Sequence, residues 1–377
     1  MDSIPFNWPV PLGRELEYVT QAATSGHLAG DGPFTKRCEA FLQQHTSVAR
    51  ALLTTSCTHA LEMAALLLDV KPGDEVIVPS FTFVSTVNAF VLRGATPVFA
   101  DIRPDTLNID ERQLPGLITP RTRAIVVVHY AGIACDMDAI AATAARAGVP
   151  VIEDNAHGLF GRYHGRPLGS LGAMATLSFH DTKNFTCGEG GALLLNDAAL
   201  TGRAEILREK GTNRSRFFRG QVDKYTWVDL GSSYIPSEMN AAFLLGQLEQ
   251  FETVQQRRAR LFKTYATELA GWADANGVVL PHVPDGCDPA WHLFYLLMPD
   301  LERRQRFIAH LKAKAIHAVF HYLPLHLAPM AAMWHSRPGL CPVTENASDR
   351  LVRLPFFTTM KADVQTQVID AVTSFRL

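Results

Sequence analysis

A lysine that follows an apolar run is the first residue of this chain whose position indicates chemistry. Lys183 comes shortly after the apolar run 174–179, and a glycine-rich turn, GEGG at 188–191, follows it. Burial removes water from an amine, which lowers its pKa and makes it a nucleophile near neutral pH. Most lysines are solvated surface residues, so this position alone leaves both interpretations open.

An acidic pair follows another apolar run. Glu153 and Asp154 come at the end of the run 149–153, and His157 lies three residues later. A carboxylate at the tip of a buried strand needs a partner, because burying it unpaired is costly. The alternative is that Asp154 caps the next turn and His157 is an ordinary loop histidine.

A group of hydroxyl residues lies between a third apolar run and a helical stretch. This group, TTSCT at 54–58, includes Cys57 and Thr58. The first N–H groups of a helix have no partner within the helix and form a ready anion site. The alternative is that one of the hydroxyl side chains acts only as an N-cap.

Together, a lysine, an acid and an anion site on neighbouring strand ends are the attachments that pyridoxal phosphate requires. The lysine bonds to the aldehyde, and the acid keeps the ring nitrogen protonated so that the ring accepts carbanion electrons. The helix start and a hydroxyl such as Ser178 would hold the phosphate. Other chemistry is less well supported, because the sequence has no HExxH metal motif, no GxSxG elbow and no GxxxxGK[ST] loop. We therefore expect this cofactor and no metal.

The elements that must position these residues alternate along the first two-thirds of the chain. Expected strands are 51–54, 75–78, 96–100, 124–129, 149–153, 174–179 and 191–195, with helical stretches such as 59–68 and 137–147 between them. Continuous runs of β-branched residues and leucine are typical of strands covered on both faces. This pattern predicts a mostly parallel sheet in a three-layer α/β domain, with ligands at the carboxyl ends of the strands.

The last third differs. The segment 211–237 is polar, aromatic and basic, and it is too long for an ordinary connection. After it we expect one long helix over 237–270, strands over 291–298 and 318–323, and helices over 301–315 and 362–374. These elements predict a smaller α/β domain, and we place the boundary so that residues 1–250 form the large domain and 251–377 the small one.

Composition excludes several classes of protein. The chain has 377 residues, of which 47% are hydrophobic and 19% charged, so it can fill a large core. Lys and Arg number 35 against 37 Asp and Glu, giving a net charge of −2 and no basic excess for binding nucleic acid. There is no signal-peptide pattern, no continuous apolar span for a membrane and no CxxC pair among the six cysteines. The expected setting is the reducing cytoplasm.

Several motifs occur together and in order: SCTHALEMA, PSFTFVSTVNA, VIEDNAHG, SFHDTKN and GEGGA. With them the chain resembles the sugar aminotransferases of the DegT/DnrJ/EryC1/StrS family, from GDGPFTKRCE to VRLPFF. The resemblance implies the α/β fold-type I aminotransferase architecture, with a seven-stranded, mostly parallel sheet in a three-layer large domain and a small α/β domain. It also implies pyridoxal 5′-phosphate as cofactor and a homodimer with active sites at the interface.

The resemblance gives each candidate residue a role. Lys183 matches the lysine that bonds to the cofactor, and Asp154 matches the acid at the pyridine nitrogen. The other matches are contacts to the ring or the phosphate: His157 near the ring hydroxyl, Phe83 stacked on the ring, and Cys57, Thr58 and Ser178 at the phosphate. Relatives with histidine in place of the lysine perform dehydration, so Lys183 favours amino transfer.

One position departs from the family. Many relatives have GYNYRMSEIQAA, in which the asparagine reaches the partner's cofactor phosphate, whereas Ser233 occupies that position in GSSYIPSE. A shorter hydroxyl contact is the expectation here. In the basic segment, Arg214, Arg219 and Lys224 are candidates to bind a nucleotide diphosphate, with a solvated loop as the alternative. Tyr322, in HYLPLH, resembles a family segment near the sugar.

Two segments, DIRPDTLNID and REKGTNRSRFFRGQVDKYTW, resemble the subgroup that makes dTDP-4-amino-4,6-dideoxygalactose for enterobacterial common antigen. This match implies transfer of the amino group of L-glutamate to C4 of dTDP-4-dehydro-6-deoxy-D-glucose. Alternatives are a relative acting at C3 or on a UDP-linked N-acetyl sugar, and a non-catalytic regulator that binds the cofactor. No helix-turn-helix extension or basic arm is present to favour a DNA-binding regulator.

Overall fold

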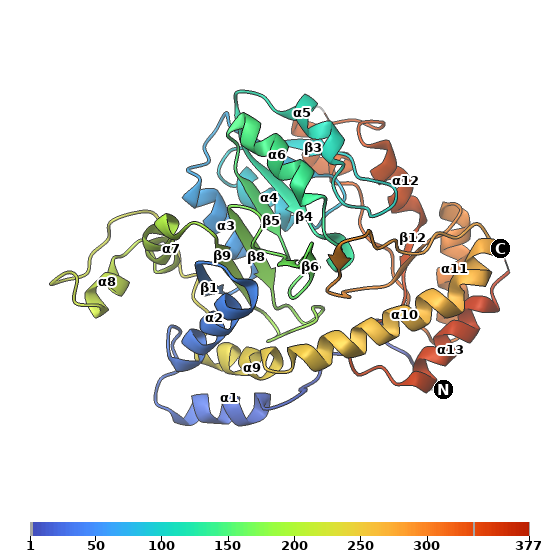
Figure 1. The fold of residues 1–377 in the computed structure, drawn as a ribbon, viewed down its shortest axis with the longest axis horizontal. Coiled ribbons are helices and arrows are strands. Elements are labelled where there is room, and N and C mark those ends of the chain that lie inside the picture. The colour runs from blue at the N-terminus through green and yellow to red at the C-terminus, as the bar shows by residue number, and fades with distance from the viewer. Residues whose placement is uncertain (1–2, 335, 377) are drawn as a thin grey trace.

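The computed structural model describes residues 3–334 and 336–376, and its centre is one seven-stranded sheet (Figure 1). The strands lie in the order β1-β9-β8-β5-β4-β2-β3. Their bounds are β1 (Arg50–Thr54), β2 (Glu75–Pro79), β3 (Thr96–Ala100), β4 (Thr122–Val128), β5 (Val151–Asp154), β8 (Met174–Ser178) and β9 (Gly191–Leu195). Only β9 pairs with its neighbours in antiparallel fashion. The predicted mostly parallel sheet is therefore confirmed.

Helices cover both faces of this sheet, as continuous apolar strands require. On one face, α3 (Cys57–Leu67), α4 (Ser85–Val91) and α7 (Thr201–Arg208) pack against the side that includes Val76 and Val126. On the other face, α6 (Met137–Ala147) packs against Ile77 and Val127, while α2 (Pro33–Thr46) and α9 (Glu238–Leu248) pack against the side that includes Leu53. The alternation of faces along each strand confirms the three-layer arrangement.

A second apolar core lies in the last third of the chain. It gathers α10 (Phe251–Ala275), α11 (Leu301–Ala313), α13 (Ala362–Thr373) and the antiparallel pair β11 (Tyr295–Leu297) and β12 (Leu351–Arg353). Ile4 also packs here, because residue 4 pairs with Ile316. The boundary at residue 250 falls between α9 and α10 and stays a prediction.

The remaining elements are short or peripheral. They are α1 (Glu15–Thr24), α5 (Leu114–Leu117), α8 (Arg214–Phe218), α12 (Pro342–Arg350) and a small sheet of β10 (Cys287–Asp288), β6 (Arg162–Tyr163) and β7 (Arg166–Pro167). We call residues 212–230 the arm; its helix α8 stands away from the sheet at the left of Figure 1. Of the helices in the described part of the chain, none has the length and apolar character needed to cross a membrane.

The expected single helix over 237–270 is wrong, because the chain forms α9 and α10 with a break at residues 249–250. Helix α9 packs against α1 and α2, whereas α10 packs against α13 in the second core. Helix α10 itself reaches both cores, because Val254 packs in the core beside α2 and α9, whereas Leu261 packs in the second core. The break lies at the place where the predicted domain boundary falls.

The second core also has less strand than expected. The strand predicted over 291–298 is reduced to β11, since Arg258 donates hydrogen bonds to the carbonyl groups of Trp291 and His292 in place of a strand partner. The strand predicted over 318–323 is wrong: only Val319 forms a bridge, with Arg353. Aromatic and β-branched residues in 318–323 resemble a strand in composition, but most of this segment lines a cavity.

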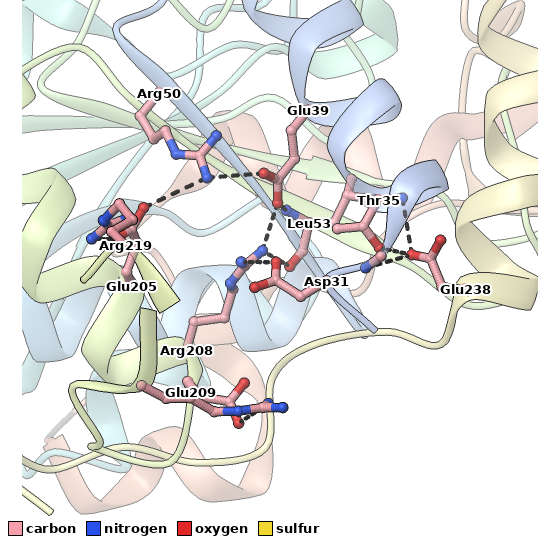
Figure 2. A network of polar contacts seen from close by, with 12 residues as sticks. Asp31, Thr35, Glu39, Arg50, Leu53, Glu205, Arg208, Glu209, Arg219 and Glu238 are labelled. Carbon is pink, nitrogen blue, oxygen red and sulfur yellow. Dashed lines mark hydrogen bonds and ion pairs between the residues drawn. The ribbon is translucent and has the colours of Figure 1, made fainter. Parts of the chain in front are cut away.

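A buried charge cluster ties β1 to the helices beside it (Figure 2). Arg208, at the end of α7, is 2% exposed and donates hydrogen bonds of 2.6 Å to both Glu39 and Asp31. Arg50 lies 3.0 Å from Glu39 and 3.6 Å from Glu205. The cluster satisfies charges that would otherwise be costly to bury.

Replacing Arg208 with methionine should lower the free energy of unfolding by about 3 kcal/mol, since it leaves buried carboxylates without their main partner. Arg219→Met is the matched control, because its partner Glu205 is the same kind of acid but the Arg219 side chain is 47% exposed. An exposed pair contributes less than about 1 kcal/mol. Urea denaturation of both variants measures the difference, and equal losses would contradict the role given to Arg208.

Candidate active site

Eight of the predicted site residues meet at one cavity of about 820 Å³. The carboxyl ends of β5 and β8 and the first turns of α3 and α4 form one side, and β12 with the segment 319–323 forms the other. The predicted residues that line it are Cys57, Thr58, Phe83, Asp154, His157, Ser178, Lys183 and Tyr322. The structure thus brings together residues from five separate segments of the sequence, around positions 57, 83, 155, 180 and 322.

Lys183 reaches this cavity from a turn that follows β8. The turn is closed by a hydrogen bond from the backbone N–H of Lys183 to the carbonyl of His180, 2.9 Å long. Burial lowers the pKa of the Lys183 amine from 10.5 to about 8, whereas the nearby Asp154 raises it. A useful fraction of the amine is therefore neutral, and so nucleophilic, near physiological pH.

This pKa can be tested on the cofactor-free chain by competitive acetylation. With a pKa of about 8, about a quarter of the Lys183 amine is neutral at pH 7.5, against roughly one thousandth for an ordinary lysine. The rate of labelling of the Lys183 peptide, read by mass spectrometry, should therefore rise with a midpoint near pH 8. Asp154→Asn removes the charge that raises this pKa and should move the midpoint lower. A midpoint above pH 10 would refute the assignment.

Asp154 ends β5 and is held by two donors. Thr86 donates from Oγ1 to Oδ2 at 2.7 Å, and the backbone N–H of Ala156 donates to Oδ1 at 3.2 Å. Burial raises the pKa of the Asp154 carboxyl, while these hydrogen bonds oppose the change. Among the described residues, no arginine, lysine or histidine forms an ion pair with it. A buried carboxylate without its own counter-ion fits a cationic ring nitrogen.

The start of α3 forms the predicted anion site. Ser56 is the N-cap and accepts a hydrogen bond from the N–H of His59, so the capping alternative holds for Ser56. Cys57 and Thr58 occupy the first turn, where N–H groups have no partner within the helix. A Cβ at Gly191 would lie 2.4 Å from the Cys57 nitrogen, so only glycine lets β9 approach this turn so closely.

Three imidazoles stand together on another wall of the cavity. The ring of His157 stacks on that of His292, with centroids 4.2 Å apart, and His321 lies 6.1 Å from His157. Burial lowers the pKa of all three rings, which are therefore neutral at physiological pH. The Nδ1 atom of His157 is buried with no hydrogen-bond partner in the described part of the chain. It is available to a ligand hydroxyl.

These observations fit pyridoxal phosphate. As far as the described residues go, the cavity offers an amine of lowered pKa, a carboxylate without a counter-ion, an unpartnered imidazole nitrogen and a first helical turn with unpaired N–H groups. They correspond to the aldehyde, ring nitrogen, ring hydroxyl and phosphate of the cofactor. Phe83, with 58% of its surface exposed, lies at the cavity wall, where a ring could stack on it.

Four predicted residues do not line the cavity of their own chain. Ser233 is exposed and pairs with Glu209 through a single bridge. In the arm, Arg214 lies 3.2 Å from Glu209 and Arg219 lies 2.7 Å from Glu205. Lys224 is exposed as well. The roles predicted for these four residues stay predictions.

The sequence analysis missed Thr86, His292 and Arg353, which line the same cavity. His292 and Arg353 are single polar residues within or beside an apolar run, in WHLFY and VRLPFF, whereas Thr86 is one of several polar residues in PSFTFVSTVNA. A polar residue at a position expected to be buried is the signal that could have found them. Whether such a residue lines a cavity depends on tertiary folding, which the apolar run alone does not reveal.

Comparisons with known proteins agree with this geometry. The model of the DegT/DnrJ/EryC1/StrS aminotransferase family matches residues 12–373. The spore coat polysaccharide biosynthesis protein SpsC of Bacillus subtilis is 34% identical over 377 residues, which cover 98% of this chain and 96% of SpsC.

Two solved structures are similar in fold and in sequence. Spr1654 from Streptococcus pneumoniae, in its PLP-form, is 27% identical, with a TM-score of 0.91 and coverage of 99% of this chain and 98% of that one. The sugar aminotransferase CalS13 from Micromonospora echinospora is 28% identical, with a TM-score of 0.89 and coverage of 98% and 99%. The protein is thus a PLP-dependent sugar aminotransferase of fold type I, and the chain belongs to the DegT/DnrJ/EryC1/StrS aminotransferase family.

Proposed function

We propose that the enzyme transfers the amino group of L-glutamate to C4 of dTDP-4-dehydro-6-deoxy-D-glucose. The product would be dTDP-4-amino-4,6-dideoxy-D-galactose, for cell-surface polysaccharides such as enterobacterial common antigen. The observation that carries the amino-transfer chemistry is the Lys183 amine, whose pKa is lowered to about 8 in the cavity that also holds Asp154. The similarity to SpsC, a spore coat polysaccharide biosynthesis protein, supports a role in polysaccharide synthesis. Both substrates are cytoplasmic metabolites, so we place the enzyme there.

Lys183 and Asp154 have different roles in the proposed reaction. When bound, pyridoxal phosphate supplies an electron sink for the carbanion. Lys183 takes the proton from the α-carbon of the amino donor and later delivers a proton to C4 of the sugar. Because one amine on one wall of the cavity serves both transfers, both occur on the same face. Asp154, oriented by Thr86 and Ala156, holds a fixed negative charge opposite the ring nitrogen.

We also propose that the enzyme works as a homodimer with its active sites at the interface. Large apolar side chains are exposed on the arm and at the cavity rim: Phe83, Phe218, Tyr225, Trp227 and Leu323. Exposed large apolar side chains on these two features indicate surfaces that another chain covers. In this arrangement Ser233 contacts the partner's cofactor phosphate, and Arg214, Arg219 and Lys224 contact the nucleotide diphosphate.

Assays of the purified holoenzyme with L-glutamate and a panel of keto-sugar nucleotides test the substrate. We expect the highest kcat/KM with dTDP-4-dehydro-6-deoxy-D-glucose, and a product that carries the amine at C4 by mass spectrometry and NMR. A preference for a 3-keto sugar or a UDP-linked 4-keto N-acetyl sugar would replace the proposed substrate by that one. Binding without turnover of any sugar would refute the proposal.

A further inference from the structure

Asn184, the residue directly after Lys183, is buried and attaches the lysine turn, residues 180–184, to a distant segment. Its Nδ2 donates a hydrogen bond of 2.7 Å to the carbonyl of Ala290, and its Oδ1 lies 2.9 Å from Nδ1 of His292. The two partners follow Asn184 by 106 and 108 residues in the sequence. Both polar atoms of this one side chain therefore hold the distant segment beside Lys183.

This segment, residues 290–292, is itself held firmly. The backbone N–H of Ala290 donates to the carbonyl of Gly132 at 2.9 Å, and that of His292 donates to the carbonyl of Ala131 at 3.1 Å. The Arg258 guanidinium donates to the carbonyl of His292 as well. The segment is thus a fixed base for the lysine turn.

The contact with Asn184 determines which nitrogen of the His292 ring carries the proton. The Asn184 amide nitrogen donates to the Ala290 carbonyl, and the opposite amide orientation would set oxygen against oxygen there. The Asn184 oxygen therefore faces His292, and Nδ1 of the ring must donate to it. Burial lowers the pKa of His292 well below its usual value, so the ring is neutral and has one proton, on Nδ1. A ring that turned over would lose this bond, so its orientation is fixed as well.

The same ring supports His157. The two imidazole planes are inclined by 24°, with centroids 4.2 Å apart, whereas the His321 ring lies 6.1 Å from that of His157. Nδ1 of His157 has no hydrogen-bond partner among the described residues, so no bond at that atom holds the ring in place. Stacking on His292 is therefore the contact that sets the plane of His157.

These contacts form a continuous path between two residues of the site, from Lys183 through Asn184 and His292 to His157. We propose that Asn184 and His292 are positioning residues: Asn184 holds the lysine turn in place, and the ring of His292 fixes the plane of His157. The inference goes beyond the proposed function, because it concerns the amino-transfer site itself and not the sugar that accepts the amine.

Two substitutions of His292 separate its two contacts. His292→Asn keeps an N–H group near the position of Nδ1, so it can still donate to Asn184, but it has no ring to stack on His157. His292→Phe keeps an aromatic ring of similar size but has no N–H group for Asn184. Under the proposal, each variant loses one effect and retains the other.

The two effects are read as cofactor affinity and as kcat of the half-reaction with L-glutamate. In His292→Asn the affinity for pyridoxal phosphate should fall by about fivefold, as for loss of an aromatic pair, while kcat falls by less than about twofold. In His292→Phe the pattern should be reversed, with kcat lower by about threefold and the affinity nearly unchanged. Asn184→Leu, which keeps the size but removes both hydrogen bonds, should lower kcat by about tenfold.

Acetylation of the cofactor-free chain gives a readout apart from turnover. In Asn184→Leu the lysine turn is less firmly held, so water reaches the Lys183 amine, and the midpoint of its acetylation should rise from near pH 8 by about one unit. The other groups that influence this amine, Cys57, Asp154 and Arg353, are unchanged in the variant. A rise therefore reports on the position of the turn.

Asn196→Leu is the matched control. The side chain of Asn196 also donates to two carbonyl groups, of Gly169 and Gly172, but it does not line the cavity. This variant should lower the unfolding temperature without changing kcat, cofactor affinity or the acetylation midpoint. Equal losses of kcat in Asn196→Leu and Asn184→Leu would overturn the proposal, because they would reflect general destabilisation.

Further results also decide for or against the proposal. Neutron diffraction of the cofactor-free protein should place the His292 proton on Nδ1, and a proton on Nε2 would overturn the path of contacts. Equal effects of His292→Asn and His292→Phe on both readouts would remove the division of roles, and an unchanged kcat and midpoint in Asn184→Leu would remove Asn184. If the wild-type enzyme failed to react with L-glutamate, the proposed function would fail, whereas cofactor affinity and acetylation would still test these two residues.

Discussion

Alanine in place of Lys183 should lower turnover by about 10⁴-fold, because the variant loses both the nucleophile and the only group assigned to the two proton transfers. Cofactor affinity should fall much less, since the α3 turn, Asp154 and His157 remain. Steady-state assays measure the first effect, and equilibrium dialysis with pyridoxal phosphate measures the second.

A chemical readout separates this role from a structural one. Borohydride reduction of the wild-type holoenzyme should attach the vitamin to the peptide that contains Lys183, and no such adduct should form in Lys183→Ala. Lys36→Ala is the control, because Lys36 is exposed on α2, outside the cavity. Turnover near the wild-type rate in Lys183→Ala, or an adduct on another lysine, would remove Lys183 from the mechanism.

Replacing Asp154 with asparagine is expected to cost about 10³-fold in kcat, comparable to losing one preorganised electrostatic contact at a reacting centre. Asparagine keeps the size and can still accept from Thr86, but it carries no charge to keep the ring nitrogen protonated. The loss should therefore appear in both half-reactions alike.

Thr86→Val gives a graded test of the same contact. It removes the 2.7 Å hydrogen bond to Asp154 but leaves the charge, so the loss in kcat should be about tenfold. Asp181→Asn, an exposed position outside the cavity, should change kcat little. If Asp154→Asn and Asp181→Asn behaved alike, the charge of Asp154 would have no part in catalysis.

The large sheet could be predicted from the sequence because its strands are buried on both faces. Each of the seven expected strands overlaps an observed one, and those at 96–100 and 191–195 have the expected bounds. Lys183 and Asp154 could be found for the same reason, since a polar residue just after such a strand lies at the carboxyl edge of the sheet. At this edge of the sheet, the positions expected from the sequence pattern agree with the observed strand topology.

The small core could not be predicted as well, because its contacts are tertiary. Arg258 takes up carbonyl groups that a strand partner would otherwise use, and no local pattern reveals that distant side chain. The position of Arg353 at the cavity likewise depends on how β12 packs in the folded chain. A polar residue that lines a cavity has no local signature beyond its polarity.

The charge cluster behind β1 has a consequence for redesign. Arg219 on the arm pairs with Glu205, which Arg50 links to Glu39 and so to Arg208. A chimaera that imports a relative's arm, made to test the nucleotide-binding role proposed for it, would leave Glu205 facing whatever replaces Arg219. The arm and its acceptor acid must therefore be transplanted as one unit, with α7 included in the exchanged fragment.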